Sequence, residues 1–358
     1  MSSAFRLRED LDSLPAYVPG ARPTEGRRVY KLSSNENAFP PLPAVLAAVT
    51  QATAELNRYP DLLATEVAEA IADHLAVTAD RVVVGNGSVA VLETLLLATC
   101  RPGDDVVYAW RSFEAYPIAI QLTGATGVPV PVTGEGRHDL PAMAAALTPA
   151  TRAVLLCSPN NPTGTVIHHD ELRDFLARVP RDVLVVLDEA YIDFVTDPEA
   201  ARGLDLLADH PNLVVLRTFS KAHGLAGLRV GFALADPTVV PGLRSASTPF
   251  GVNAPAQAAA IAALRVSRDI AEHAARVVAK RDAITAELRS MGWQVPQAQG
   301  NFYWLPLGDD AADFAAAAAE AGAIVRAFQG DGVRVTVGED DGNAIVRDVA
   351  ARWLEQGR

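Results

Sequence analysis

"DVLVVLDEAY" occupies residues 182–191 and contains an unbroken apolar run that ends at Asp188. Apolar side chains at successive positions, without alternating polar ones, are typical of a strand that is covered on both faces. Burying an unpartnered carboxylate is costly, so Asp188 at the end of such a strand requires a cationic or hydrogen-bonding partner. The stretch therefore predicts a central strand with a polar site at its carboxyl end.

Six further apolar runs of the same kind lie along the chain. They span residues 81–85, 105–110, 127–132, 152–158, 212–219 and 228–235. Helical patterns separate many of these runs, as in residues 89–100 and 168–179. Strands that alternate with helices indicate an α/β fold with a mostly parallel, seven-stranded sheet flanked by helices.

Outside these runs the amino-acid composition of the chain changes twice. Proline interrupts residues 1–40 repeatedly, which is typical of an arm that lies across another surface. From residue 253 onward, alanine-rich helical segments are followed by short strands and a terminal helix. We therefore expect an N-terminal arm (1–40) packed on the small domain or a partner subunit, a large domain (41–252) and a smaller C-terminal α/β domain (253–358).

The composition is that of a globular enzyme and argues against some partners. Of the 358 residues, 49% are hydrophobic and 21% are charged, and the formal net charge is -12 at pH 7. Nucleic acids and anionic membranes attract basic surfaces, so neither is an expected partner. The first twenty residues lack the apolar core of a signal peptide, and no apolar run reaches the ~18 residues of a membrane span. A cytoplasmic protein is expected.

Two cysteines, Cys100 and Cys157, each stand at the end of an apolar run. This position favours buried free thiols over a disulfide or a metal site. No metal is expected.

Lys221 is unusual because the chain has three lysines and twenty-eight arginines. It follows the apolar run 212–219, so its amine is expected at the carboxyl edge of the sheet, where α/β folds bind ligands. A desolvated primary amine can lose its proton and form a Schiff base, whereas a guanidinium cannot. Lys221 is therefore a candidate for covalent chemistry.

Other polar and aromatic residues follow the same strand ends. In chain order they are Gly87, Ser88, Phe113, Asn161, Asp188, Tyr191, Ser220 and Arg229. Taken singly, each has an ordinary structural explanation, such as a glycine connector, a core aromatic or an asparagine turn. Together with Lys221 they supply what pyridoxal phosphate requires: an amine for its aldehyde, an acid for its ring nitrogen, and donors for its ring oxygen and phosphate.

The assignment of groups to this cofactor follows its chemistry. Asp188 would keep the ring nitrogen protonated, and Asn161 and Tyr191 would donate to the ring oxygen beside the aldehyde. Arg229 and Ser220, together with the turn at Gly87 and Ser88, would hold the phosphate dianion. A nicotinamide dehydrogenase would instead need a G-x-G-x-x-G turn, which "GNGSVAVLE" does not contain.

Several motifs resemble those of the fold type I aminotransferases, and more narrowly those of the histidinol-phosphate aminotransferase group. The motifs are "SPNNPTG" (158–164), "DEAY" (188–191), "SKAHGLAGLRVG" (220–231) and "VRVTVG" (333–338). The resemblance extends from "YVPG" (17–20) through "LSSNEN" (32–37) and "NRYPD" (57–61) to the C-terminal part. It implies a fold type I pyridoxal-phosphate-dependent transferase.

The resemblance also implies roles for individual residues. It identifies Lys221 as the Schiff-base lysine that moves the substrate's α-proton, with Asp188 and Tyr191 beside it, and Phe113 as the aromatic stacked on the ring. Tyr59 is similar to a tyrosine that reaches the phosphate of the neighbouring subunit, which implies a homodimer with shared active sites. Arg334 resembles the clamp for the substrate carboxylate, and Arg326 and Tyr17 resemble residues at the far end of the substrate.

Three stretches suggest the substrate: "WRSFEAYP" (110–117), "NRYPD" (57–61) and "TFSKAHGLAGLR" (218–229). These look like the aromatic amino acid (phenylalanine) aminotransferases, in which an amino group moves between phenylalanine, tyrosine or tryptophan and 2-oxoglutarate by a ping-pong mechanism. Trp110, Phe113 and Tyr17 are candidate walls for an aromatic side chain. Phe113 and His223 replace tyrosines common in the histidinol-phosphate enzymes, and we expect a structural role for His223. Histidinol-phosphate aminotransferase is the alternative, and a decarboxylase or lyase on the same scaffold is a third.

Overall fold

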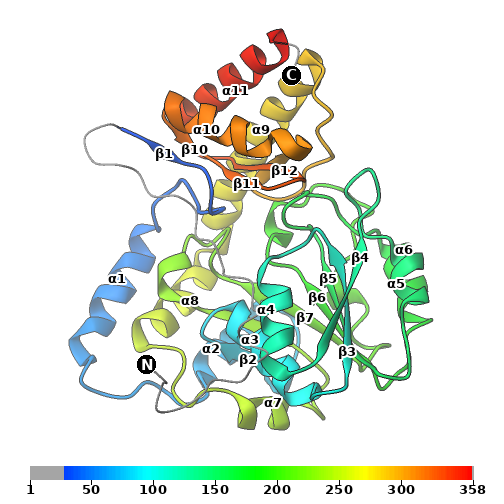
Figure 1. Cartoon of the computed structure of the whole chain (residues 1–358). Helices are drawn as coiled ribbons and strands as arrows, with labels where there is room; N and C mark the ends of the chain where they lie inside the picture. Colours follow the sequence, from blue (N-terminus) through cyan, green and yellow to red (C-terminus); the bar gives the residue numbers. More distant parts are fainter. Residues whose placement is uncertain (1–27, 357–358) are drawn as a thin grey trace, which may run out of the picture.

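The computed structural model describes residues 28–356 of the chain. The predicted site residue Tyr17 and most of the predicted N-terminal arm lie outside the described residues. The described part forms a larger half around a seven-stranded sheet and a smaller half around a three-stranded sheet (Figure 1).

The seven-stranded sheet has the strand order β2-β8-β7-β6-β5-β3-β4. Strand β8 runs antiparallel to both of its neighbours, and the other pairs are parallel. The strands are β2 (Val82–Gly85), β3 (Asp105–Trp110), β4 (Thr126–Pro131), β5 (Thr151–Cys157), β6 (Leu184–Asp188), β7 (Leu213–Thr218) and β8 (Gly231–Leu234). Apart from a few residues at its ends, each predicted apolar run coincides with one strand, which confirms the mostly parallel sheet.

The central strand β6 shows why its run contains no alternating polar residues. Val185 and Leu187 pack into the apolar cluster on one face of the sheet, and Val186 packs into the cluster on the other. Successive side chains of a strand point to opposite faces. Both faces of β6 are therefore covered, and each position needs an apolar side chain.

Helices cover the two faces of this sheet. Helices α3 (Ser88–Thr99), α4 (Ala115–Thr123) and α7 (Val240–Ala246) share the cluster with Val186. The opposite face is covered by α2 (Thr65–Leu75), α5 (Leu140–Ala145), α6 (His169–Leu176) and α8 (Ala254–Arg265), with α1 (Pro43–Ala52) packed against α8. Short 3-10 turns span Thr53–Glu55, Ala79–Arg81, Ile192–Phe194, Gly203–Asp205, Ala226–Leu228 and Gly308–Asp310.

The smaller half consists of an antiparallel sheet with helices packed on it. Its strands β9 (Phe302–Leu305), β11 (Arg326–Phe328) and β12 (Gly332–Thr336) have the order β11-β12-β9, and its helices are α9 (Ser267–Met291), α10 (Ala311–Ala321) and α11 (Asp340–Glu355). A short parallel pair joins β1 (Tyr30–Lys31) to β10 (Ala323–Ile324). The described end of the predicted arm is thus attached to the smaller half.

Two helices of the smaller half end where the local sequence directs. Helices α9 and α10 stop at Gly292 and Gly322, whose φ angles are 110° and 108°. Glycine adopts this left-handed conformation without a steric penalty, which makes it the usual residue after a helix.

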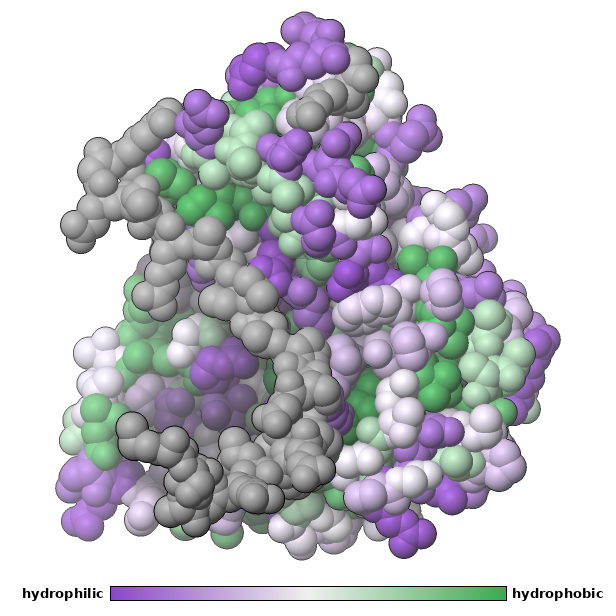
Figure 2. Space-filling view, viewed as in Figure 1, coloured by the Kyte–Doolittle hydropathy of each residue, from purple (hydrophilic) through white to green (hydrophobic). Residues whose placement is uncertain are grey.

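In Figure 2, hydrophilic side chains cover much of the upper part of the visible surface, around the end of α11.

The position of α8 bears on the predicted domain boundary. This helix packs against α1 and α2 of the larger half, although residue 253 was expected to begin the smaller domain (Figure 1). We therefore propose that the large domain extends through α8, and that the small domain begins within α9.

Two simpler expectations concern cysteines and membranes. Cys100 and Cys157 are both buried and free. Among the helices of residues 28–356, none has the length and apolar character needed to cross a lipid bilayer.

Candidate active site

The carboxyl ends of the parallel strands and the edge of the small sheet enclose a cavity of about 230 Å³. Parallel strands place their carboxyl ends at one edge; for example, Cys157 at the end of β5 pairs with Asp188 at the end of β6. The predicted site residues that line the cavity are Ser88, Phe113, Asn161, Asp188, Tyr191, Ser220, Lys221, Arg229, Arg326 and Arg334. Residues spread over most of the chain therefore meet in one place.

Lys221 lies just after β7, with its amine in the interior. Its Nζ is 3.4 Å from the carbonyl oxygen of Ser34 and 3.3 Å from that of Asn35, and 5.5 Å from the ring centre of Tyr191. Burial lowers the pKa of Lys221 to about 7, and the positive charge of Arg334 adds to the shift. A large fraction of this amine is therefore neutral near pH 7 and able to act as a nucleophile.

The low pKa of Lys221 has a measurable effect on the stability of the cofactor-free protein. The unfolded chain keeps the Lys221 proton up to about its ordinary pKa of 10.5, whereas the folded chain loses it near pH 7. Burying this lysine therefore destabilises the fold most below pH 7, and the cost fades as the pH rises toward 10.

Lys221→Met should accordingly raise Tm below pH 7, with a gain that shrinks between pH 7 and pH 10. Thermal unfolding of both proteins across this range, followed by circular dichroism, measures the difference. A gain that is independent of pH would contradict the assignment.

Asp188 is held by two hydrogen bonds at the end of β6. The hydroxyl of Tyr116 donates to Oδ2 at 3.0 Å, and the backbone N–H of Ala190 donates to Oδ1 at 3.1 Å. Burial raises the pKa of Asp188 to about 6, and the Tyr116 bond opposes this rise. The carboxyl group is thus oriented and faces the cavity, as a partner for a protonated ring nitrogen must be.

Sequence reasoning did not assign the contact between Tyr116 and Asp188. The ring of Tyr116 also packs edge-on against Phe113, with centroids 5.6 Å apart and an interplanar angle of 84°. Phe113 precedes α4 and Tyr116 lies in its first turn, and no local pattern indicates a bond between Tyr116 and a residue 72 positions away.

Tyr191 and Asn161 lie on the same cavity and are positioned by residues from the far ends of the chain. Asn35 Nδ2 donates to the Tyr191 hydroxyl at 3.0 Å. Arg334 Nη1 donates to Asn161 Oδ1 at 2.5 Å, and its Nη2 donates to the Ser33 carbonyl at 2.6 Å. The contact of Asn35 was also missed, although it stands in the "LSSNEN" motif.

The remaining end of the cavity has the shape of an anion site. Arg229 Nη1 donates to the hydroxyl of Ser220 at 3.3 Å, and Gly87 has a φ of 87°. A Cβ on Gly87 would overlap the Arg229 guanidinium, and one on Gly231 would overlap the backbone nitrogen of Ser88. Helix α3 begins at Ser88, so its first N–H groups and positive dipole end add to the arginine charge. These residues fit a phosphate group.

Three residues that the sequence singled out, Tyr59, Arg326 and His223, contact other side chains of the protein. Tyr59 is 82% exposed and stacks on Phe250, with ring centres 4.6 Å apart, rather than lining this cavity. Arg326 lines the cavity but donates to both carboxylate oxygens of Glu114, at 3.0 and 2.7 Å. His223 packs its ring on Phe219 at 4.7 Å.

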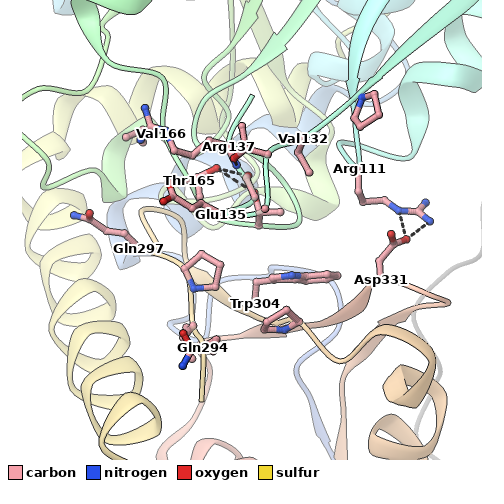
Figure 3. Close-up of a pocket in the computed structure, with 18 of the residues that line it drawn as sticks. Arg111, Val132, Glu135, Arg137, Thr165, Val166, Gln294, Gln297, Trp304 and Asp331 are labelled. Atoms are coloured by element: carbon pink, nitrogen blue, oxygen red, sulfur yellow. Dashed lines mark hydrogen bonds and ion pairs between the residues drawn. The ribbon is translucent and has the colours of Figure 1, made fainter. Parts of the chain in front are cut away.

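A second, larger groove of about 690 Å³ lies beside the first cavity, between the two halves (Figure 3). Trp110, a candidate wall for the substrate, lines this groove and not the central cavity. Arg111 crosses the groove from the large half, and its Nε donates to Asp331 Oδ2 at 2.7 Å. Trp110 lies under this guanidinium, 4.4 Å from its carbon, so it supports an interdomain ion pair.

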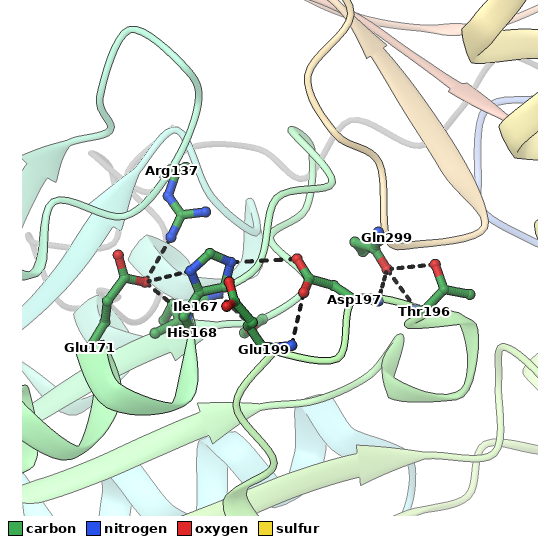
Figure 4. A network of polar contacts seen from close by, with 9 residues as sticks. Arg137, Ile167, His168, Glu171, Thr196, Asp197, Glu199 and Gln299 are labelled. Atoms are coloured by element: carbon green, nitrogen blue, oxygen red, sulfur yellow. Dashed lines mark hydrogen bonds and ion pairs between the residues drawn. The ribbon is translucent and has the colours of Figure 1, made fainter.

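A polar network at the border of the larger groove joins two loops of the large half, and its members Arg137 and Asp197 line that groove (Figure 4). His168 Nε2 is 3.4 Å from Asp197 Oδ2, and the backbone N–H of Glu199 donates to Asp197 at 2.9 Å. The ligand atoms of these three residues lie within 4.8 Å of one another, as metal ligands would. The Asp197 carboxylate is therefore already engaged by His168 and by the backbone of Glu199, and the backbone N–H of Asp197 donates to Gln299 Oε1 at 3.2 Å.

Comparison with known proteins defines the class. Residues 27–347 match the family Aminotransferase class I and II, and the chain belongs to it. Its fold is also that of a solved histidinol-phosphate aminotransferase from Sinorhizobium meliloti in complex with pyridoxal-5'-phosphate. That structure has a TM-score of 0.88 and 26% identity, and the match covers 99% of this chain and 100% of that one. The chain is therefore a fold type I aminotransferase.

Closer relatives by sequence carry a more specific name. An aromatic amino acid aminotransferase from Streptomyces avermitilis is 50% identical, with 98% of each chain covered. One from Thermobifida fusca is 51% identical, with 97% of each chain covered. The resemblance inferred from the motifs is thus confirmed at the level of the family.

Proposed function

We propose that the protein is a pyridoxal-phosphate-dependent aminotransferase that moves the amino group between an aromatic amino acid and 2-oxoglutarate. The observation that carries this proposal is one cavity lined by the Lys221 amine, the Asp188 carboxyl group and an anion cradle at Ser220 and Arg229. The names of relatives at about half identity support the aromatic substrate.

The residues of the cavity would hold the cofactor by distinct groups. Lys221 Nζ would bind its aldehyde carbon, and Arg229, Ser220 and the N–H groups at Gly87 and Ser88 would bind its phosphate. Asp188 would accept a hydrogen bond from its ring nitrogen. Phe113 would pack on the ring, while Asn161 and Tyr191 would donate to the ring oxygen.

When bound, pyridoxal phosphate would supply an aldehyde for the substrate amine and an electron-withdrawing ring. Lys221 Nζ, once displaced by the substrate amine, would remove the proton from the substrate α-carbon, and its low pKa suits a base near neutral pH. Asp188 would keep the ring nitrogen protonated throughout. The second half-reaction, with the oxo acid, would use the same groups in reverse order.

Arg334 is proposed to bind the substrate carboxylate. Its guanidinium is buried and held by neutral oxygens of Asn161 and Ser33, so it is fixed in one orientation. A carboxylate can form a bidentate pair with such a group. The apolar walls for the side chain would be Phe113 and Phe328, with Arg326 at the far end. The motif resemblance assigns Tyr17 to the same end of the substrate.

A homodimer with shared active sites is part of the proposal. Tyr59 lies in an exposed apolar surface, as expected of a residue that is buried only against a second copy. The other exposed large hydrophobic residues of this region are Leu46, Leu56, Leu62, Leu63 and Phe250. Tyr59 would reach the phosphate in the partner's cavity. The cytoplasm is the proposed location of the protein.

The test combines spectroscopy with a comparison of donors. The purified protein should show the visible absorbance of lysine-bound pyridoxal phosphate, and borohydride should remove it. With 2-oxoglutarate as acceptor, kcat/KM should be higher for phenylalanine and tyrosine than for histidinol phosphate. A preference for histidinol phosphate would favour the alternative aminotransferase, and release of carbon dioxide would favour a decarboxylase. A protein that binds no cofactor would end the proposal.

A further inference from the structure

The pair formed by Glu114 and Arg326 stands at the wall of the cavity. Glu114 precedes helix α4 and follows the aromatic Phe113, while Arg326 begins strand β11 of the small half. The same guanidinium nitrogen of Arg326 contacts both carboxylate oxygens, at 3.0 and 2.7 Å. Arg326 is 11% exposed and Glu114 is 29% exposed, so this ion pair is largely shielded from water.

The pairing determines the charge that a ligand meets at this wall. A shielded guanidinium attracts a phosphate or carboxylate strongly, but here a protein carboxylate already occupies that position. The ring of Phe328 lies beneath the same arginine, with its centre 5.5 Å from the guanidinium carbon. The wall is therefore a neutral ion pair over an aromatic ring.

We propose that Glu114 determines the substrate specificity of this site. By neutralising Arg326, it disfavours substrates whose far end is anionic and leaves the space to an uncharged aromatic ring. The inference rests on the proposed function, and it names a residue that decides between the aromatic and phosphorylated donors. Glu114 contacts the arginine and is not proposed to take part in the chemistry.

The physical reason is competition between carboxylates. An anionic side chain can pair with Arg326 only if it displaces Glu114, which leaves the Glu114 charge near the incoming anion. A phenyl group meets no such penalty. On this account 2-oxoglutarate, whose far end is a carboxylate, competes with Glu114 for Arg326 whenever it binds.

Two unreactive ligands separate this effect from general binding. Glutarate and 3-phenylpropanoate each carry one carboxylate for Arg334, but their far ends are anionic and aromatic respectively. Calorimetric titration of the cofactor-loaded protein would measure both dissociation constants in wild type and in Glu114→Gln, which keeps the size of the side chain. Glutarate should bind about tenfold tighter or more to the variant, because Arg326 is released for a charged pair. The affinity for 3-phenylpropanoate should stay within about twofold, since it gains no such pair.

Two further variants, Arg326→Gln and the double variant, test the same role if Glu114→Gln folds poorly. Arg326→Gln should weaken the binding of glutarate much more than that of 3-phenylpropanoate, because only glutarate has a second carboxylate to pair with the arginine. The double variant Glu114→Gln with Arg326→Gln should cancel the gain for glutarate. In steady-state assays, Glu114→Gln should raise the ratio of kcat/KM for histidinol phosphate to that for phenylalanine by a similar factor.

Glu171→Gln is a matched control. Glu171 pairs with Arg137 at 2.7 Å on the exposed loop network of Figure 4, away from the cavity. This variant should leave both dissociation constants unchanged. Equal changes for both ligands in Glu114→Gln, or none, would overturn the specificity role. Failure of the wild-type protein to transaminate phenylalanine would instead overturn the proposed function.

Discussion

Lys221→Ala is expected to lower kcat by about 10⁴-fold or more, because one amine supplies both the covalent attachment and the proton transfer. The measurement is the steady-state rate with phenylalanine and 2-oxoglutarate. Mass spectrometry after borohydride treatment should find the cofactor covalently attached to wild type and not to the variant. The fold should survive, since within residues 28–356 the hydrogen bonds of this amine go to two backbone carbonyl oxygens.

The chain offers a matched control for this experiment. Lys280 lies on helix α9, where it pairs with Asp340 at 2.6 Å, outside the cavity. Lys280→Ala should retain the rate of wild type and the covalent attachment of the cofactor. Appreciable turnover in Lys221→Ala would mean that another group performs the chemistry.

Asp188→Asn is expected to lower kcat by roughly 10²–10³-fold, since a neutral amide does not stabilise the positive charge of a protonated ring nitrogen. The amide oxygen could still accept from the N–H of Ala190, and the amide NH2 would then face the Tyr116 hydroxyl, which can accept a hydrogen bond, so the packing should be preserved. The rate and the dissociation constant of pyridoxal phosphate should both be measured. We expect weaker cofactor binding together with the loss of rate.

Asp193→Asn controls for the loss of a carboxylate in the same loop. Asp193 lies five residues after Asp188 and is exposed. Its replacement should change neither the rate nor the affinity for the cofactor. If Asp188→Asn keeps the full rate, the acid is not the partner of the ring nitrogen.

The sheet could be predicted because buried parallel strands leave a strong local signal. In β5, β6 and β7 nearly every position faces an apolar cluster, so the chain shows continuous runs of valine and leucine. The ends of these runs then indicated Asp188 and Lys221. The domain boundary near residue 253 was harder to place, because the packing of α8 on α1 depends on tertiary contacts.

The missed contacts have a common cause. Asn35 bonds to Tyr191 across 156 positions of sequence, and Arg326 bonds to Glu114 across 212. No local pattern encodes such pairs, because they exist only once the small half has docked on the large one. Trp110 was likewise a plausible wall by sequence, but it faces the neighbouring groove.

The chemical groups of this protein follow from its sequence alone. An amine, an acid and an anion cradle stand at the ends of buried strands, and the hydrophobic pattern is enough to bring strand ends together at one edge. The tertiary structure decided how those groups behave. It set the burial that lowers the pKa of Lys221 and the pairing that neutralises Arg326, because electrostatic energies depend on distances and on exclusion of water that only the packed domains create.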